Sequence, residues 1–221
     1  MRRVHRIATI LVGVPLLVWT ATGFAFTWFD FAAVRGERDR VEAPPVRADE
    51  VKVALADVLA RAGGQARSVE LRSVGGRATW IVDGRRIDAG DGSAGAPLGE
   101  RAAAQIARDA HRQKPAIGSV VLLWDKASVV DLDVPVWRVR LDDDHGSEVF
   151  VSPATGKIVA WRNRAWRRFD ALWSLHVFGF VNRDNPAQLP LRIAGGLALL
   201  TAMSGAWLLL VHYARRTRRV A

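Results

Sequence analysis

The chain of 221 residues contains no cysteine. This absence excludes disulfides, thiol catalysis, thiolate zinc sites, iron–sulfur clusters, covalent attachment of c-type haem and a lipidated cysteine. The sequence also lacks an HExxH motif, a glycine-rich phosphate-binding loop and a dinucleotide fingerprint. We therefore expect no self-contained catalytic site and no enzyme activity, beyond at most the role of a redox subunit.

Acidic residues are few where basic residues gather. The net charge is +10, yet residues 1–6 and 214–221 together hold seven arginines and no acid, and residues 162–192 hold six arginines and two acids. The intervening segment from Asp30 to Trp161 is nearly neutral, with 19 bases and 20 acids. Nucleic-acid binding requires a basic face that neutralises many phosphates. A nucleic-acid partner is therefore excluded.

Two long stretches carry no charge. Residues 7–29 are uncharged, and so are the 19 residues from Ile193 to Val211. As helices these runs measure roughly 34 and 28 Å, which is enough to cross the hydrocarbon core of a bilayer. The sequence therefore predicts transmembrane helices at 7–29 and 191–213. A cleaved signal peptide is the alternative for the first run, but the apolar stretch continues past the weak cleavage site at 23–25.

The arginines of the two tails predict the orientation. Because positive charge is retained on the cytoplasmic side, residues 1–6 and 214–221 should be cytoplasmic tails of a bacterial inner-membrane protein. The segment between the two helices would then lie in the periplasm. Within the second helix, small residues every four positions predict a face that packs on the first helix or on a second copy, although alanine is also common in membranes. The small residues of this face are Ala194, Ala198, Ala202 and Ala206.

The exported segment has an internal repeat after a polar linker at 30–47. Unit 48–97 shows one helical pattern followed by three short alternating runs, and unit 98–162 shows the same order with a further run at its end. Trp80 and Trp137 fall in the same slot of the two units. The predicted fold class is α+β, with a tandem α-β-β-β antiparallel domain between the two membrane helices.

The closing segment VSPATGKIVAW resembles the PepSY domain. RRVHR and TATG near the first span, and WRNRAWRRFDALWSLHVFGF before the second, resemble the PepSY-associated transmembrane proteins. The resemblance implies a modulatory module that binds another exported protein, such as a peptidase. Some larger relatives are haem proteins that reduce ferric siderophores, and on that resemblance His5 and His176 become candidate ligands of a b-type haem.

Geometry adds His212 to these candidates. In an antiparallel helix pair, His5 and His212 would lie at the same cytoplasmic edge, where facing imidazoles suit a bis-histidine haem. The alternative is that these histidines are interfacial anchors, since two helices cannot enclose a porphyrin. A homodimer would supply four helices and remove that objection.

Residues 163–180 predict an amphipathic helix that lies in the lipid headgroup region. Its aromatic stripe and its arginines would contact membrane lipid; they are Arg164, Trp166, Arg167, Arg168, Phe169, Trp173 and Phe180.

Two polar features have plainer explanations. The acidic turn at 142–144 lacks the ligand alternation of a calcium loop and is interpreted as solvated, and His111 is interpreted as a helix cap.

Two functions from different classes remain. The first is a membrane-anchored binding module that acts on another periplasmic or inner-membrane protein. The second is a haem-bearing subunit in electron transfer or ferric-siderophore reduction. A third interpretation makes the chain one subunit of a larger assembly whose partner carries the chemistry.

Overall fold

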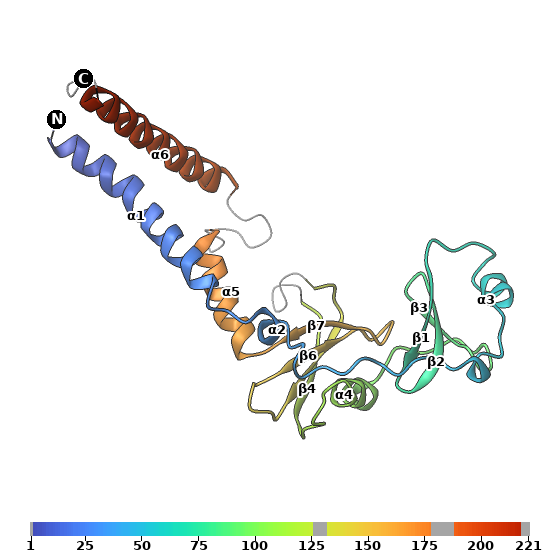
Figure 1. Cartoon of the computed structure of the whole chain (residues 1–221). Coiled ribbons are helices and arrows are strands. Elements are labelled where there is room, and N and C mark those ends of the chain that lie inside the picture. The colour runs from blue at the N-terminus through green and yellow to red at the C-terminus, as the bar shows by residue number, and fades with distance from the viewer. Residues whose placement is uncertain (1, 126–131, 178–187, 218–221) are drawn as a thin grey trace. The chain divides into compact units, whose positions relative to one another are not determined.

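The computed structural model describes residues 2–125, 132–177 and 188–217 and forms two compact units. Residues 1–29 and 168–221 form the first unit, and residues 30–167 form the second (Figure 1). The first unit is helical, whereas the second contains all of the strands that the structure describes.

The helical unit pairs α1 (Arg2–Phe26) with α6 (Gln188–Thr217). The helices lie side by side, with the beginning of α1 and the end of α6 at the same end of the pair (Figure 1). Within the described residues, none of the helices combines the length and the apolar character needed to cross a bilayer. The two predicted transmembrane helices are therefore not confirmed, although α1 and α6 occupy most of their ranges.

The second unit holds two antiparallel sheets. One contains β1 (Val69–Val74), β2 (Arg77–Val82) and β3 (Arg85–Asp88) in that order. The other has the order β4-β5-β6-β7, and its strands are β4 (Ile117–Leu123), β5 (Val136–Leu141), β6 (Glu148–Val151) and β7 (Ile158–Arg162). These sheets confirm the predicted α+β class with antiparallel sheets. Alternating apolar residues between glycine-containing turns favour such meanders.

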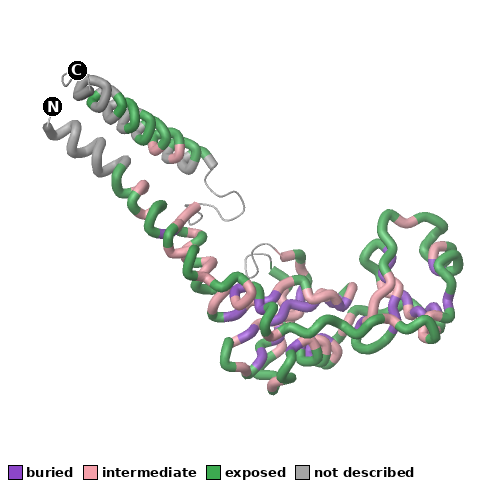
Figure 2. The backbone as a smooth tube through the Cα atoms, viewed as in Figure 1, coloured by how far each residue is buried: buried purple, intermediate pink, exposed green. Residues whose placement is uncertain are grey.

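Each sheet buries one face against a helix. Val58 of α3 (Leu55–Arg61) packs with Val82 and Ile87, and α4 (Glu100–Asp109) covers β4, β5 and β6. The larger core lies under α4, where the buried positions follow the strands (Figure 2). Its buried members are Ala103, Ala107, Val139, Leu141, Val149, Val151 and Trp161.

The two tryptophans matched in the sequence make the same contact in each half. The indole N–H of Trp80 donates to the carbonyl of Val53 at 3.2 Å, and that of Trp137 donates to the carbonyl of Leu98 at 2.7 Å. Both acceptors lie two residues before the helix of their unit. Each tryptophan therefore ties its middle strand to the start of its helix.

The turn of the VSPATGK segment joins the two halves. Gly156 has φ +71°, and a Cβ there would lie 2.4 Å from Cγ1 of Val74 on β1. Next to it, Lys157 forms an ion pair with Glu70, also on β1. Arg86 of β3 donates to the carbonyl of Ala154 at 3.1 Å. The glycine is thus required by its backbone conformation and by the close approach of the first sheet.

The structure differs from prediction at two places before β1. The linker contains a short helix, α2 (Phe31–Val34), because the Asp30 side chain accepts from the backbone N–H groups of its first turn. The helical pattern predicted at the start of unit 48–97 forms an α-helix only from Leu55, after η1 (Ala48–Glu50). Lys52 and Val53 instead donate their backbone N–H groups to the carbonyl of Ala89, which holds this stretch extended.

Candidate functional site

The helical unit brings two of the motif segments together. His176, the last residue of α5 (Arg164–His176), lies against α1, where its Nδ1 is 2.8 Å from Oγ1 of Thr22 in the TATG segment. The imidazole stacks on Trp19 at 5.6 Å between ring centroids and meets Phe26 edge to face at 5.2 Å. The histidine is therefore oriented by one hydrogen bond and by aromatic rings on two sides.

The hydrogen bonds of Thr22 favour one tautomer of His176. The Thr22 hydroxyl donates to the carbonyl of Val18 at 2.7 Å, so its oxygen accepts the proton of the imidazole Nδ1. Nε2 then carries the lone pair. Burial lowers the pKa of His176, while the Trp19 backbone acts in the opposite direction. The ring is consequently neutral near pH 7 and has the protonation state that a metal ligand requires.

The predicted haem ligands do not converge within one chain. Thr22, the neighbour of His176, lies 17 residues along α1 from His5, which corresponds to about 26 Å of helix. His5 and His176 therefore cannot bind one iron in a single copy. His5 and His212 lie on the two paired helices, near the end that the beginning of α1 and the end of α6 share, and His212 is exposed. Their roles as ligands stay predictions.

The aromatic stripe of α5 packs against α1. Phe169 and Trp173 lie 5.1 and 5.9 Å from Phe26 between ring centroids, and Trp173 remains 47% exposed. Arg168 is exposed. Phe180 lies outside the described residues. Contact of these residues with lipid stays a prediction, as does helix packing through the alanine positions. Ala198 is half-buried, Ala202 and Ala206 are exposed, and the surroundings of Ala194 are not described.

Three predicted membrane-facing residues at the start of α5 have protein partners. Arg164 donates to the carbonyl of Asp144 at 3.0 Å, and Arg167 donates to that of Gly146 at 3.0 Å. The Trp166 ring lies under the guanidinium of Arg162, 4.5 Å from its centroid. The first turn of α5 is therefore bound to the turn between β5 and β6.

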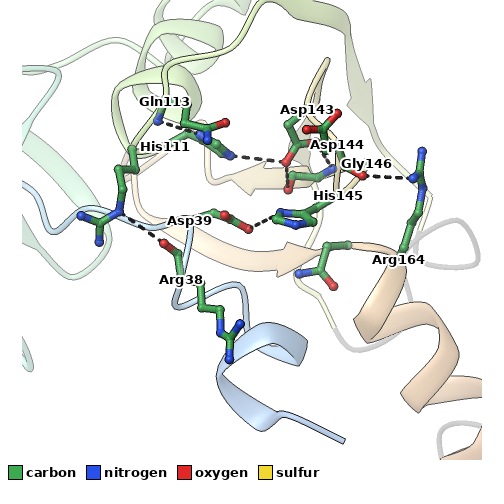
Figure 3. A network of polar contacts seen from close by, with 12 residues as sticks. Arg38, Asp39, His111, Gln113, Asp143, Asp144, His145, Gly146 and Arg164 are labelled. Atoms are coloured by element: carbon green, nitrogen blue, oxygen red, sulfur yellow. Dashed lines mark hydrogen bonds and ion pairs between the residues drawn. The ribbon is translucent and has the colours of Figure 1, made fainter.

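Asp143 of that turn forms a buried pair with His111, which follows α4, and the sequence did not predict this pair (Figure 3). Nε2 of His111 lies 3.3 Å from Oδ2 of Asp143, and the two side chains are 0% and 2% exposed. Ser147 donates to the same carboxylate from its backbone N–H at 2.7 Å and from its hydroxyl at 2.6 Å. The interpretation of His111 as a cap was wrong, and so was that of Asp143 as solvated, because packing of α4 on the sheet buries both side chains; Asp142 and Asp144 of the acidic turn are exposed, as predicted.

Residues next to this pair hold the segment that follows α2. Asp39 accepts from Nδ1 of His145 at 2.9 Å, and its carbonyl accepts from the backbone N–H of Arg112 at 2.7 Å (Figure 3). Trp161 stacks on His111 at 5.8 Å. We call His111, Asp143, Asp39 and His145 the histidine–aspartate network. It joins the end of α4, the β5–β6 turn and the chain just after α2.

The electrostatics of the network follow from these contacts. Burial raises the pKa of Asp143, but the hydrogen bonds from Ser147 and the neighbouring His111 outweigh burial, so that the pKa lies below its ordinary value. The carboxylate is therefore ionised at neutral pH. Its charge is balanced by donors inside the protein rather than by solvent.

Three members of the network lie close enough together to be candidate ligands of one metal ion. Atoms of Asp39, His111 and Asp143 that could serve as ligands lie within 4.8 Å of one another. However, Nδ1 of His111 accepts the backbone N–H of Gln113 at 3.1 Å, so the imidazole proton is on Nε2, facing Asp143. A metal would need the lone pair at that nitrogen. The cluster is therefore a hydrogen-bonded pair, and its chemistry does not fit a metal centre.

Comparison with known proteins gives the family. No curated protein and no solved structure matches the chain. A family model described as PepSY-associated TM region matches residues 2–220, nearly the whole chain. This agrees with the motif segments that meet at Thr22 and His176 and with the VSPATGK turn that joins the two sheets. The chain therefore belongs to the PepSY-associated TM family of membrane-associated proteins.

Proposed function

We propose that this protein is an inner-membrane-anchored module whose periplasmic body binds an extended segment of another exported protein at the free edge of β4. In this proposal residues 7–29 and 191–213 cross the membrane with both termini in the cytoplasm. Membership of a membrane-associated family supports the anchor. The shared end of α1 and α6 supports the proposal that both termini lie on one side.

The observation that carries the proposal is the composition of β4. Among the described strands, β1, β3, β4 and β7 lie at sheet edges, and three of these carry charged residues. Such charges oppose unwanted pairing. The β4 sequence IGSVVLL has no charge and no proline, so its outward N–H and C=O groups can accept another strand.

The side chains along β4 favour the same role. Ile117, Val121 and the adjoining Trp124 are 37%, 40% and 70% exposed. An added strand would cover these apolar groups while its backbone forms the sheet hydrogen bonds. The partner chemistry is therefore an extended, largely apolar peptide segment, and no catalytic residue is needed.

Site-specific photocrosslinking in producing cells tests this proposal. A photoreactive amino acid at Ser119 should crosslink to a second polypeptide, whereas the same probe at Val159 on β7, which is 45% exposed, should not. Val121→Lys should abolish the crosslink, because a charge opposes strand addition. Equal crosslinking from both positions, or a crosslink that survives Val121→Lys, would refute binding at β4.

A second candidate function is haem binding, favoured by the lone pair on Nε2 of His176. His5 and His212 would hold one b-type haem, and His176 would hold another that is completed by a ligand from a second copy. The haem would supply one-electron transfer, and Thr22 would keep the His176 ring in the ligating tautomer.

An absorbance spectrum of protein purified from haem-producing cells tests this second function. A Soret band that is lost in His176→Ala, or in His5→Ala and His212→Ala, would support ligation by those residues. Thr22→Val should shift or weaken a His176-dependent band, whereas Ser174→Ala on the same helix should not. A colourless preparation would refute haem binding and leave the binding module untouched.

A further inference from the structure

A cleft in the second unit lies beside the β2–β3 hairpin. It encloses about 460 Å³ between the end of α3, the hairpin, the loop at 92–97 and Ala154 of the VSPATGK turn. Most of these elements belong to the segment that carries the first sheet, whereas Ala154 belongs to the segment that carries the second. The cleft therefore exists only when the two segments are folded together. Its charged lining residues are Arg61, Asp83, Arg85 and Arg86.

The lining has an excess of positive charge. Three arginines face one aspartate, and both oxygens of Asp83 are used locally. Oδ1 accepts from the backbone N–H groups of Arg67 and Ser68, at 3.0 and 2.9 Å, and Oδ2 accepts from that of Arg67 at 3.3 Å. The carboxylate therefore holds the chain just before β1 against the end of β2.

Two of the three arginine side chains of the cleft donate hydrogen bonds to backbone carbonyls. Arg61 donates to the carbonyl of Gly92 at 2.6 Å, and Arg86 donates to those of Ala154 and Ala96. Each guanidinium has five N–H donors, so both retain donors beyond these bonds. Burial lowers the pKa of Arg86, which is the direction expected of a cation that has lost water.

A cleft that gathers three guanidinium groups, one of them partly desolvated, has the chemistry of an anion site. We propose that this cleft binds a small ligand through a carboxylate or phosphate group, held by Arg61, Arg85 and Arg86. A planar carboxylate or a phosphate oxygen pair matches the forked donors of arginine. The apolar groups of Val82, Ile87 and Pro97 would contact the rest of the ligand. This site is independent of the β4 edge.

Calorimetric titration of the full chain in detergent tests the site with three probes. Succinate and inorganic phosphate represent the two anionic sources, and neutral succinamide is the matched control. We expect saturable binding of succinate or phosphate that weakens with added salt. The preferred anion identifies the source, and succinamide should not bind.

Two variants assign the binding to the cleft. Arg85→Gln should weaken the anion at least about tenfold, because one charge-assisted contact is lost. Arg85 is exposed, so this variant should fold normally. Arg47→Gln removes an exposed arginine outside the cleft and should leave binding unchanged. Three results would overturn the proposal. They are no binding of either anion at about 10 mM, binding of succinamide equal to that of the anions, and unchanged anion binding in Arg85→Gln.

Discussion

Replacement of His111 by phenylalanine should destabilise the sheet-containing unit strongly. The phenyl ring can keep the stacking on Trp161, but it removes the Nε2–H donor and leaves the Asp143 carboxylate buried. Removing one partner of a buried pair costs about 3–5 kcal/mol. Because Ser147 still donates two hydrogen bonds to that carboxylate, we expect the lower end of that range, about 3 kcal/mol, in the free energy of unfolding.

The measurement is thermal unfolding of the full chain in detergent, followed by tryptophan fluorescence. A loss of about 3 kcal/mol corresponds to a decrease in Tm of roughly 6–12 °C for a domain of this size. His145→Ala is the matched control, since it removes the exposed histidine of the same network. His145 is 60% exposed, so its contact with Asp39 should contribute less than about 1 kcal/mol.

A double variant decides whether the buried charge causes the effect. If the loss in His111→Phe comes from an uncompensated carboxylate, then adding Asp143→Asn should restore about 1–2 kcal/mol. Two independent packing defects would instead add. A Tm that changes by less than a few degrees in His111→Phe, or a double variant less stable than the single one, would refute the reasoning.

Three other predictions concern the turn, the repeat and the helical unit. Gly156→Ala should cost about 2–4 kcal/mol in unfolding free energy, from positive φ and the clash with Val74, whereas Gly75→Ala, which meets no atom within 4 Å, should cost only about 1 kcal/mol. Equal Tm losses would contradict the role of the close approach. Trp137→Phe should cost about 1 kcal/mol through the lost bond to Leu98, and an unchanged Tm would count against it. Because burial lowers the pKa of His176 below 6.5, the unfolded state binds the proton first. Stability should therefore fall as the pH drops below about 6.5, and His176→Phe should flatten this dependence of Tm between pH 7.5 and 5.5.

The histidine–aspartate network lies near both ends of the sheet-containing unit. The chain enters the sheet-containing unit at Asp30 and leaves it at Arg167. Asn163 donates to the carbonyl of Ala33 at 2.8 Å, and Asp39 and Arg164 bind on either side of the β5–β6 turn. Both connections are therefore fixed to one region of the same unit.

The local elements of this protein follow from its sequence. Short alternating runs separated by glycine-containing turns predicted the strands, and the matched positions of Trp80 and Trp137 predicted equivalent roles in two halves. These features depend on residues that are near one another in the chain, where periodicity and turn chemistry act directly. The family resemblance likewise rested on contiguous segments, and the family comparison confirmed it.

Only the tertiary structure decided which polar groups became partners. His111 and Asp143 are 32 residues apart in the sequence, and Thr22 and His176 are 154 residues apart, so no local pattern predicts either pair. The hydrogen bonds of Arg164 and Arg167 to backbone carbonyls of the β5–β6 turn were likewise visible only in the structure, and their contact with lipid stays a prediction. Burial and proton placement depend on which elements pack together, and the free energy of that packing comes from contacts between distant parts of the chain.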